Sequence, residues 1–400
     1  MPRRGLLIAA VLALPACGIA TVAPAQPLDK TADRPGAAAP SALTAEYQRQ
    51  LAAYRQARQK FDDEAAAYWG AVAQRRRLRN AKRREHEEIV LHDYVLTQPP
   101  LYAGPPPPSY PPRADEEAAR ETPAPPRKYV PVVADFLKSA QDHFGFAPQR
   151  PRSEVEFKRA YARLALDASL TKEQIVRIYV FETGGNGTYD AQAGLEYSRR
   201  GRAVSPALGY NQLLNTNSVE LLAERGDEFI VALKTRAAAL DGEAKEALEH
   251  KIDILRRMIT FCRTVPDDWS AHDALANTPQ GLGVHAILLD GDIGPLLQVQ
   301  KLVDSVAFAR RQGHKAPLSA AELQMMNLTG DGNGLDIVTM PAAMRERVPT
   351  ANFFLQAGYE RNPVAMRNNV VAKLLATTDA AMDRGMKLPG ARELAAAATR

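Results

Sequence analysis

The chain has 400 residues, of which 46% are hydrophobic and 24% are charged, and its net charge is +5. A chain of this length is not too small to bury a sizeable hydrophobic core, and it allows two or three domains. The mild basic excess suits an anionic partner such as cell wall, membrane or nucleic acid, although solvated protein surfaces carry similar charge.

The N-terminus is typical of an export signal. Two arginines precede an apolar run at 6–14, which is far shorter than the roughly 20 residues that a membrane-spanning helix needs. Processing can follow either of two patterns. Cys17 ends a lipobox-like Leu-Pro-Ala-Cys and would carry a lipid, or cleavage follows the Ala-Pro-Ala at 23–25. We favour a lipoprotein-type signal over 1–17, and therefore expect a periplasmic, membrane-anchored protein. The alternative is a soluble periplasmic or secreted protein, and in either case nucleic acid is not an expected partner.

An Ala- and Pro-rich tether over 18–43 is expected to lead into an amphipathic helical segment over 44–95. In this segment aromatic residues recur at every seventh position: Tyr47, Tyr54, Phe61 and Tyr68. Such a stripe predicts a short coiled-coil seam or a surface that packs on a neighbour.

The same segment contains a dense run of positive charge at Arg75–Arg84, with six arginines and one lysine in ten residues. We expect this run to be exposed. It would contact anionic lipid headgroups or wall polymers, or else form a solvated helix face.

Residues 96–128 are rich in proline and predict a linker, either an extended spacer or a strap along the protein. The remaining 129–400 shows helical periodicity without strand alternation, so we expect an all-α domain. The expected helices are 132–143, 153–168, 172–183, 217–225, 228–240, 243–263, 294–312, 319–326, 351–359 and 364–384.

The sequence Val-Phe-Glu-Thr-Gly-Gly places Glu182 at the end of the helix 172–183. Thr171 and Gln174 form a capping-box start, and one of the two glycines supplies a left-handed C-terminal cap. Glu182 shares the apolar face of the helix and lies in its last turn, so burial and the helix dipole should both raise its pKa. A carboxyl group of this kind can act as a general acid. The alternative is a glutamate that turns to solvent or pairs with an arginine.

A second segment, Ala207–Leu214, reads Ala-Leu-Gly-Tyr-Asn-Gln-Leu-Leu. Together with the helix-end Glu182, it resembles the soluble lytic transglycosylase family of the lysozyme-like superfamily. The resemblance implies an all-α, lysozyme-like domain of the goose-type kind, without a cofactor or metal, that acts on peptidoglycan glycan strands. It implies that Glu182 is the general acid and then the base. It assigns substrate contacts to Gly209, Tyr210, Asn211 and Gln212, with Thr183 where the family commonly has serine.

The family's third segment, Ala-Tyr-Asn-Ala-Gly, corresponds loosely to 354–358. Leu355 replaces the aromatic residue of that segment and Gln356 replaces its asparagine, so Gln356 and the nearby Tyr359 are the substrate-binding candidates here.

Lytic transglycosylases work with one carboxyl group. By resemblance, the acid protonates the glycosidic oxygen and then deprotonates the muramic acid 6-hydroxyl, which closes a 1,6-anhydro ring. Asp190 is the candidate second acid for a hydrolytic, chitosanase-like alternative, although a turn residue that accepts backbone N–H bonds is the simpler interpretation. A further alternative is a non-catalytic, wall-binding scaffold lipoprotein.

Other chemistry-bearing patterns are weak. Cys262 lies in an apolar helical context and is expected to be structural. The stretch 329–336 has only part of a calcium-loop pattern and is expected to be a glycine-rich groove loop without metal. The histidines lack metal-ligand spacing.

Overall fold

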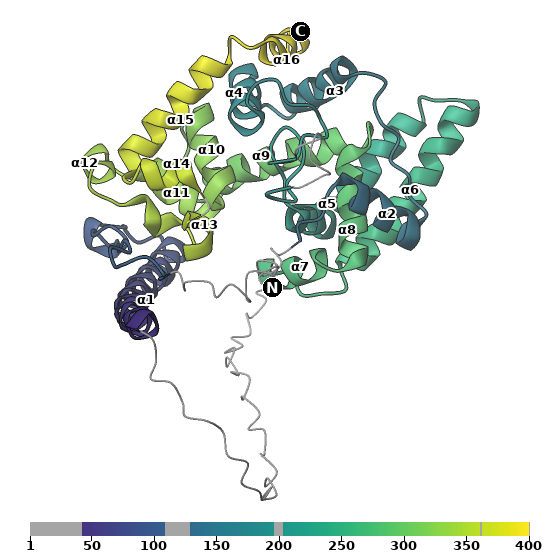
Figure 1. Ribbon diagram of the computed structural model, residues 1–400. Helices are drawn as coiled ribbons and strands as arrows, with labels where there is room; N and C mark the ends of the chain where they lie inside the picture. The colour runs from purple at the N-terminus through teal and green to yellow at the C-terminus, as the bar shows by residue number, and fades with distance from the viewer. Residues whose placement is uncertain (1–41, 109–128, 196–202, 361, 400) are drawn as a thin grey trace, which may run out of the picture.

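The computed structural model describes residues 42–108, 129–195, 203–360 and 362–399 (Figure 1). Helices account for 68% of the structure, and the described residues contain no β-strand, so the expected all-α class is confirmed. The predicted export signal, with Cys17, and nearly all of the predicted tether over 18–43 lie outside the described residues.

The helices fall into an N-terminal arm and a C-terminal body. Their bounds are α1 Ala42–Arg84, α2 Val133–Phe144, α3 Glu154–Asp167, α4 Lys172–Thr183, α5 Asn215–Ala237, α6 Gly242–Cys262, α7 Trp269–Ala276, α8 Pro279–His285, α9 Gly294–Arg311, α10 Ala320–Thr329, α11 Asp331–Thr339, α12 Ala342–Arg345, α13 Gln356–Glu360, α14 Pro363–Arg367, α15 Val371–Gly385 and α16 Pro389–Ala397. Short 3₁₀ turns lie at Leu91–Asp93 (η1), Ala286–Leu289 (η2) and Thr350–Phe353 (η3).

Three hydrophobic cores hold these helices together. The first lies among α2, α5, α6 and α8, and the second among α3, α4, α10 and α16. Helix α9 crosses the centre of the body (Figure 1) and contributes Leu297 to the first core and Leu302 to the second. The third core packs residues of α13, α14 and α15 against Tyr94 and the C-terminal half of α1. Residues 65–95 therefore pack with the body, although the sequence suggested a boundary near residue 128.

Helices α5 and α6 pack against each other as an antiparallel hairpin. The two helices predicted at 217–225 and 228–240 are one continuous helix, so that prediction is wrong. Gly226 lies at the predicted break because the helices approach closely there: an added Cβ would come within 2.5 Å of the Ile259 side chain. This glycine serves close packing, not a turn.

The C-terminal region also differs from prediction. The stretch 329–336 is not a loop, because Asp331 begins α11. The helix predicted at 351–359 is divided into η3 and α13, and the helix predicted at 364–384 is divided into α14 and α15. In the part of the chain that is described, no single helix is long and apolar enough to cross a membrane. One bent pair, Pro279–Leu289 with Gly294–Arg311 at 97°, passes that test by length and composition only.

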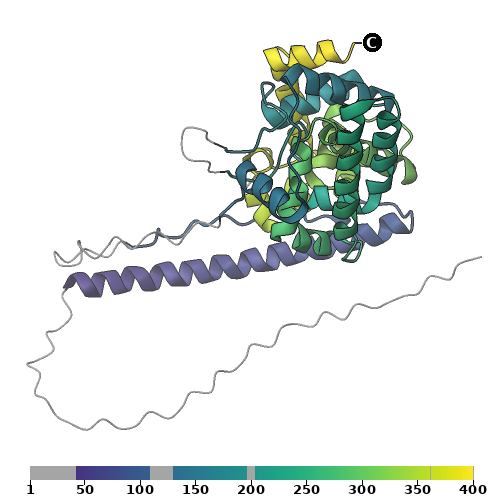
Figure 2. The same cartoon turned by 90° about the vertical axis from the view of Figure 1, so that its right-hand side faces the viewer.

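Helix α1 projects from the body as a long arm, and residues 96–108 of the proline-rich segment run back along it (Figure 2). Tyr102 packs edge-on against Phe61 and Tyr54 with ring centroids 5.6 and 6.3 Å away. The Tyr68 hydroxyl donates to the Thr97 carbonyl at 3.1 Å. Over its described part, the segment after η1 is therefore a strap, and the aromatic stripe packs against it.

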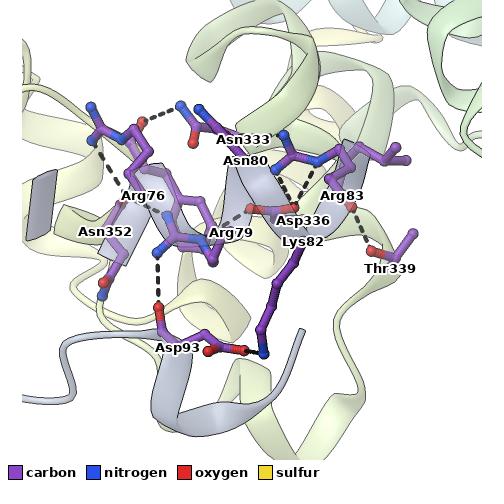
Figure 3. Close-up of polar contacts among 12 residues, drawn as sticks. Arg76, Arg79, Asn80, Lys82, Arg83, Asp93, Asn333, Asp336, Thr339 and Asn352 are labelled. Atoms are coloured by element: carbon purple, nitrogen blue, oxygen red, sulfur yellow. Dashed lines mark hydrogen bonds and ion pairs between the residues drawn. The ribbon is translucent and has the colours of Figure 1, made fainter. Parts of the chain in front are cut away.

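The basic end of α1 packs against the body, and five of its seven basic residues are buried or partly buried, so the expectation that Arg75–Arg84 is exposed is wrong for most of its charged residues (Figure 3). Arg79 is fully buried and pairs with Asp336 of α11 at 3.1 Å, and Arg83 reaches the other oxygen of that carboxylate at 2.5 Å. Lys82 pairs with Asp93 at 2.7 Å. Arg76 donates to the Phe354 carbonyl at 2.5 Å. Four of the seven basic residues therefore have partners within the chain, and Arg75, Arg77 and Arg84 remain available for an anionic surface.

Candidate active site

Glu182 is placed by the local structure that the sequence predicts. Helix α4 begins after Thr171, whose hydroxyl accepts from the Gln174 N–H at 3.1 Å while the Gln174 side chain accepts from the Thr171 N–H at 2.8 Å. It ends at Thr183, followed by Gly184 in the left-handed conformation at φ 70°. Glu182 therefore lies in the last turn of α4, beside the negative end of the helix dipole.

Helix α10 supplies the immediate partners of the Glu182 carboxyl group. Oε1 accepts hydrogen bonds from Gln324 Nε2 at 2.6 Å and from Asn327 Nδ2 at 3.0 Å. No described residue donates to Oε2, and no described lysine, arginine or histidine forms an ion pair with Glu182. Because the carboxyl group is partly buried and has only neutral donors, desolvation raises its pKa to about 7, against the lowering effect of the two amides.

This pKa fits general acid–base chemistry near neutral pH. A group with a pKa near the working pH is protonated often enough to donate, and its conjugate base is strong enough to take a proton back. Since both amides donate to Oε1, the proton of the acid form belongs on Oε2. That is also the oxygen left free among the described residues.

The Gly-Tyr-Asn segment lies directly behind this carboxyl group. Asn327 Nδ2 donates not only to Glu182 but also to the Asn211 carbonyl at 3.3 Å. The Asn211 side chain is buried and fixed by the Tyr161 hydroxyl at 3.2 Å and the Gln298 carbonyl at 2.6 Å. Asn211 therefore orients a partner of Glu182 and does not line a groove.

A tight turn at 208–213 explains the glycine of the segment. Leu208 and Leu213 pair antiparallel, and Gly209 has φ 82°. A Cβ at Gly209 would lie 2.1 Å from Gln298 Nε2, so both the conformation and the space favour glycine. The Gln212 side chain folds back and donates to the carbonyls of Ala191 and Gly209, each at 2.9 Å. With these contacts, neither Gly209 nor Gln212 faces Glu182.

Tyr210, which was expected to contact the glycan, is fully buried in this structure. Its hydroxyl donates to the Glu154 carboxylate, and its ring packs edge-on against Phe157, Tyr161 and Tyr179. Burial and the adjacent carboxylate raise the pKa of Tyr210 far above its usual range. Tyr210 therefore connects α3, α4 and the turn, and it supports the site on its buried side.

The loop after α4 has its own polar partners. Thr183 donates to the Tyr179 carbonyl at 2.6 Å, so its hydroxyl is occupied within the helix. Asp190 accepts from the Thr188 hydroxyl at 2.5 Å and forms an ion pair with Arg150 at 3.6 Å. These contacts favour the interpretation of Asp190 as a turn residue over that of a free second acid.

The remaining candidates lie in other surroundings. Gln356 is exposed on α13 and donates to Glu360 at 2.9 Å. Tyr359 is buried in the third core, where its ring lies 5.7 Å from Trp69. Neither has a hydrogen bond to Glu182 or to its α10 partners. Cys262 is buried in the first core, and burial raises its pKa to about 12, so it is a structural residue.

Two functional candidates were missed by the sequence interpretation. Gln324 and Asn327 are amides at i and i+3 within the apolar run Leu-Gln-Met-Met-Asn-Leu of α10. Polar residues on one face of an otherwise apolar helix were the available signal. Over the described residues, no group of three or more His, Cys, Asp or Glu residues could hold a metal ion.

The site was also compared with known proteins. Searches of protein-family models, curated proteins and solved structures found no match to the chain.

Proposed function

We propose that the protein is a glycan-cleaving enzyme with Glu182 as its single general acid and base, acting on peptidoglycan as a lytic transglycosylase. One observation carries the proposal. A carboxyl group at a helix end contacts two neutral amides and no described cation, and its pKa is raised to about 7. The substrate class rests on the resemblance of Glu182 and the 207–214 segment to that family, as does the lysozyme-like fold.

The chemistry follows from the two states of this carboxyl group. As the acid, Glu182 donates the Oε2 proton to the glycosidic oxygen between N-acetylmuramic acid and N-acetylglucosamine, and the bond to the anomeric carbon breaks. As the carboxylate, it takes the proton of the muramic acid 6-hydroxyl, whose oxygen attacks the anomeric carbon. The amides of Gln324 and Asn327 stabilise the carboxylate between the two steps without holding it permanently ionised, because they carry no charge.

The cellular setting is part of the same proposal. An export signal with Cys17 as the lipidated residue would place the enzyme in the periplasm, attached to a membrane and facing the wall. Contact with the membrane surface would then rest on the lipid more than on Arg75–Arg84, because three of that segment's seven basic residues are paired with acids inside the protein.

The test is incubation of the full chain, and of its Glu182→Gln variant, with purified peptidoglycan, followed by mass spectrometry of the soluble products. We expect 1,6-anhydro products, one water lighter than reducing muropeptides, and a fall in rate of roughly 10²- to 10⁴-fold in the variant. Reducing-end products would replace the proposal with a hydrolase. Loss of those products in Asp190→Asn would assign the second carboxyl group.

A third outcome points to the scaffold alternative. The burial of Tyr210 and Asn211 favours it, because two expected glycan contacts are absent. In that case neither protein releases product, and both sediment equally with insoluble wall.

A further inference from the structure

A second concave site lies away from Glu182, between α3, the end of α5 and the start of α6. It has a volume of about 510 Å³. Five arginines from three segments of the chain line it: Arg150, Arg152, Arg159, Arg163 and Arg236. We call it the arginine pocket.

The positive charge of this pocket exceeds what its own acids neutralise. Asp292 is already bound by Arg236 and by Lys251, each at 2.5 Å. Arg150 pairs with Asp190 at 3.6 Å. The second lining acid, Glu156, accepts from the backbone N–H of Arg152 at 2.7 Å. Within the described ranges, the guanidinium groups of Arg152, Arg159 and Arg163 have no acidic partner.

The spacing of two of these arginines does not favour the helix. Arg159 and Arg163 are four residues apart on α3, and like charges at that spacing destabilise a helix. Guanidinium groups bind carboxylates with two parallel hydrogen bonds, so three unpaired arginines around one hollow suit a ligand with more than one carboxylate.

The floor of the pocket adds a second requirement. Phe157, Leu240 and Leu248 line it together with small residues such as Ala244 and Ala247. A ligand that fills it therefore combines anionic groups with a small apolar part. A short acidic peptide has this composition, whereas inorganic phosphate lacks the apolar part.

The arginine pocket is also connected to the candidate active site. Arg150 belongs to the pocket, and its partner Asp190 lies eight residues after Glu182, in the loop that follows α4. The Tyr189 N–H in that loop donates to Glu154 at 3.2 Å, and Glu154 is the acceptor of Tyr210 behind the site. The segment from Glu182 to Asp190 thus runs from one site to the other.

We propose that the arginine pocket binds a short acidic peptide through Arg152, Arg159 and Arg163. The source of the peptide rests on the proposed function: on a peptidoglycan substrate it is a stem peptide with free carboxylates. A glycan bearing such peptides is then bound both at the Glu182 site and at the arginine pocket. The pocket selects strands whose peptide carboxylates keep their negative charge.

The test measures binding of synthetic Ala-Glu-Glu to the full chain by isothermal titration calorimetry. Ala-Gln-Gln-amide, which has the same N-terminus but no carboxylate, is the matched ligand. We expect binding of the acidic peptide only, weakened several-fold by raising the salt concentration because charge attraction is screened. Arg159→Gln with Arg163→Gln should weaken binding at least tenfold. The same pair changed to lysine should bind with intermediate affinity, since charge is kept but the fork is lost.

Arg55→Gln with Arg77→Gln is the control, because these arginines are exposed on α1 and outside the pocket. Unchanged binding in the Arg159/Arg163 double variant, or no binding by the parent protein, would overturn the proposal. Displacement of the peptide by millimolar phosphate at equal affinity would assign a phosphate site instead. Glu182→Gln should bind the peptide normally, so a failure of the proposed catalysis and a failure of this site give different results.

Discussion

Two carboxyl groups on neighbouring elements show how partners decide what a buried acid does. Glu182 faces two amides of α10, and its pKa is raised to about 7. Asp336, on the next helix α11, is 2% exposed and faces the guanidinium groups of Arg79 and Arg83. The first has neutral partners and can exchange a proton near neutral pH. The second forms ion pairs with two arginines of α1 and so helps to fix α1 to the body.

The largest expected effect follows from breaking the cluster. Asp336→Ala leaves the fully buried Arg79 without its counter-charge, and removal of one partner of a buried ion pair costs about 3–5 kcal/mol. Urea unfolding should show a loss of that size. Asp227→Ala is the control, because its ion pair with Arg263 is exposed and should change stability by less than about 1 kcal/mol. A loss at Asp336 no larger than at Asp227 would contradict the anchoring role.

At Glu182, by contrast, we expect a substitution to increase the free energy of unfolding. Its pKa rises from 4.5 to about 7 on folding, so the folded state binds more protons between these values and stability falls as the pH rises through them. Glu182→Gln removes that penalty. We expect the variant to be more stable by up to ~3 kcal/mol at pH 8 and nearly unchanged at pH 4. Thermal unfolding at both pH values measures this, with the exposed Glu173→Gln on α4 as control. A variant less stable at pH 8 than at pH 4, relative to the parent, would refute the raised pKa.

A smaller effect tests the amide partners. Gln324→Leu removes a donor that favours the carboxylate, so the pKa of Glu182 should rise further, by about one unit for a hydrogen bond of ~1.5 kcal/mol. The alkaline limb of the cleavage rate, or the carboxyl carbon resonance of Glu182, should move up by that amount. Gln141→Leu, exposed on α2, should leave both unchanged. A pKa that stays at about 7 would show that Gln324 does not act on Glu182.

The smallest effect concerns the arm. Tyr102→Ala removes the ring that covers Tyr54 and Phe61, and aromatic pairs contribute about 0.5–1.5 kcal/mol each. Because the ion cluster at the other end of α1 is intact, global stability should change little. Hydrogen exchange should accelerate only in the part of α1 under the strap. The neighbouring Leu101→Ala, 88% exposed, should have no effect, and equal acceleration in both variants would argue against the strap contact.

Local signals predicted the position of Glu182, whereas its partners required the fold. The capping box and the glycine after Thr183 fix both ends of α4 within twelve residues of chain. Gln324 and Asn327 are more than 140 residues away, and no local pattern brings α10 to the end of α4. The burial of Tyr210 could not be predicted for the same reason, because it depends on aromatic residues of α3 and α4 and on Glu154.

The basic segment shows the same limit of prediction from sequence. Its charge density suggested solvent because sequence alone shows no acid near enough to pair with it. Asp336 lies 257 residues from Arg79 and Asn352 lies 273 residues away, and both reach that guanidinium group in the fold. A run of like-charged residues in the sequence can therefore form a buried contact between helices.

The arm has a mechanical consequence. Helix α1 has 43 residues, which at 1.5 Å per residue is a rod of about 65 Å. The ion pairs of Arg79 and Arg83 fix the C-terminal end of α1 to the body, and the strap packs against its N-terminal half. If Cys17 is lipidated, as we propose, this rod adds a rigid length along the chain between the bilayer and the body that carries Glu182.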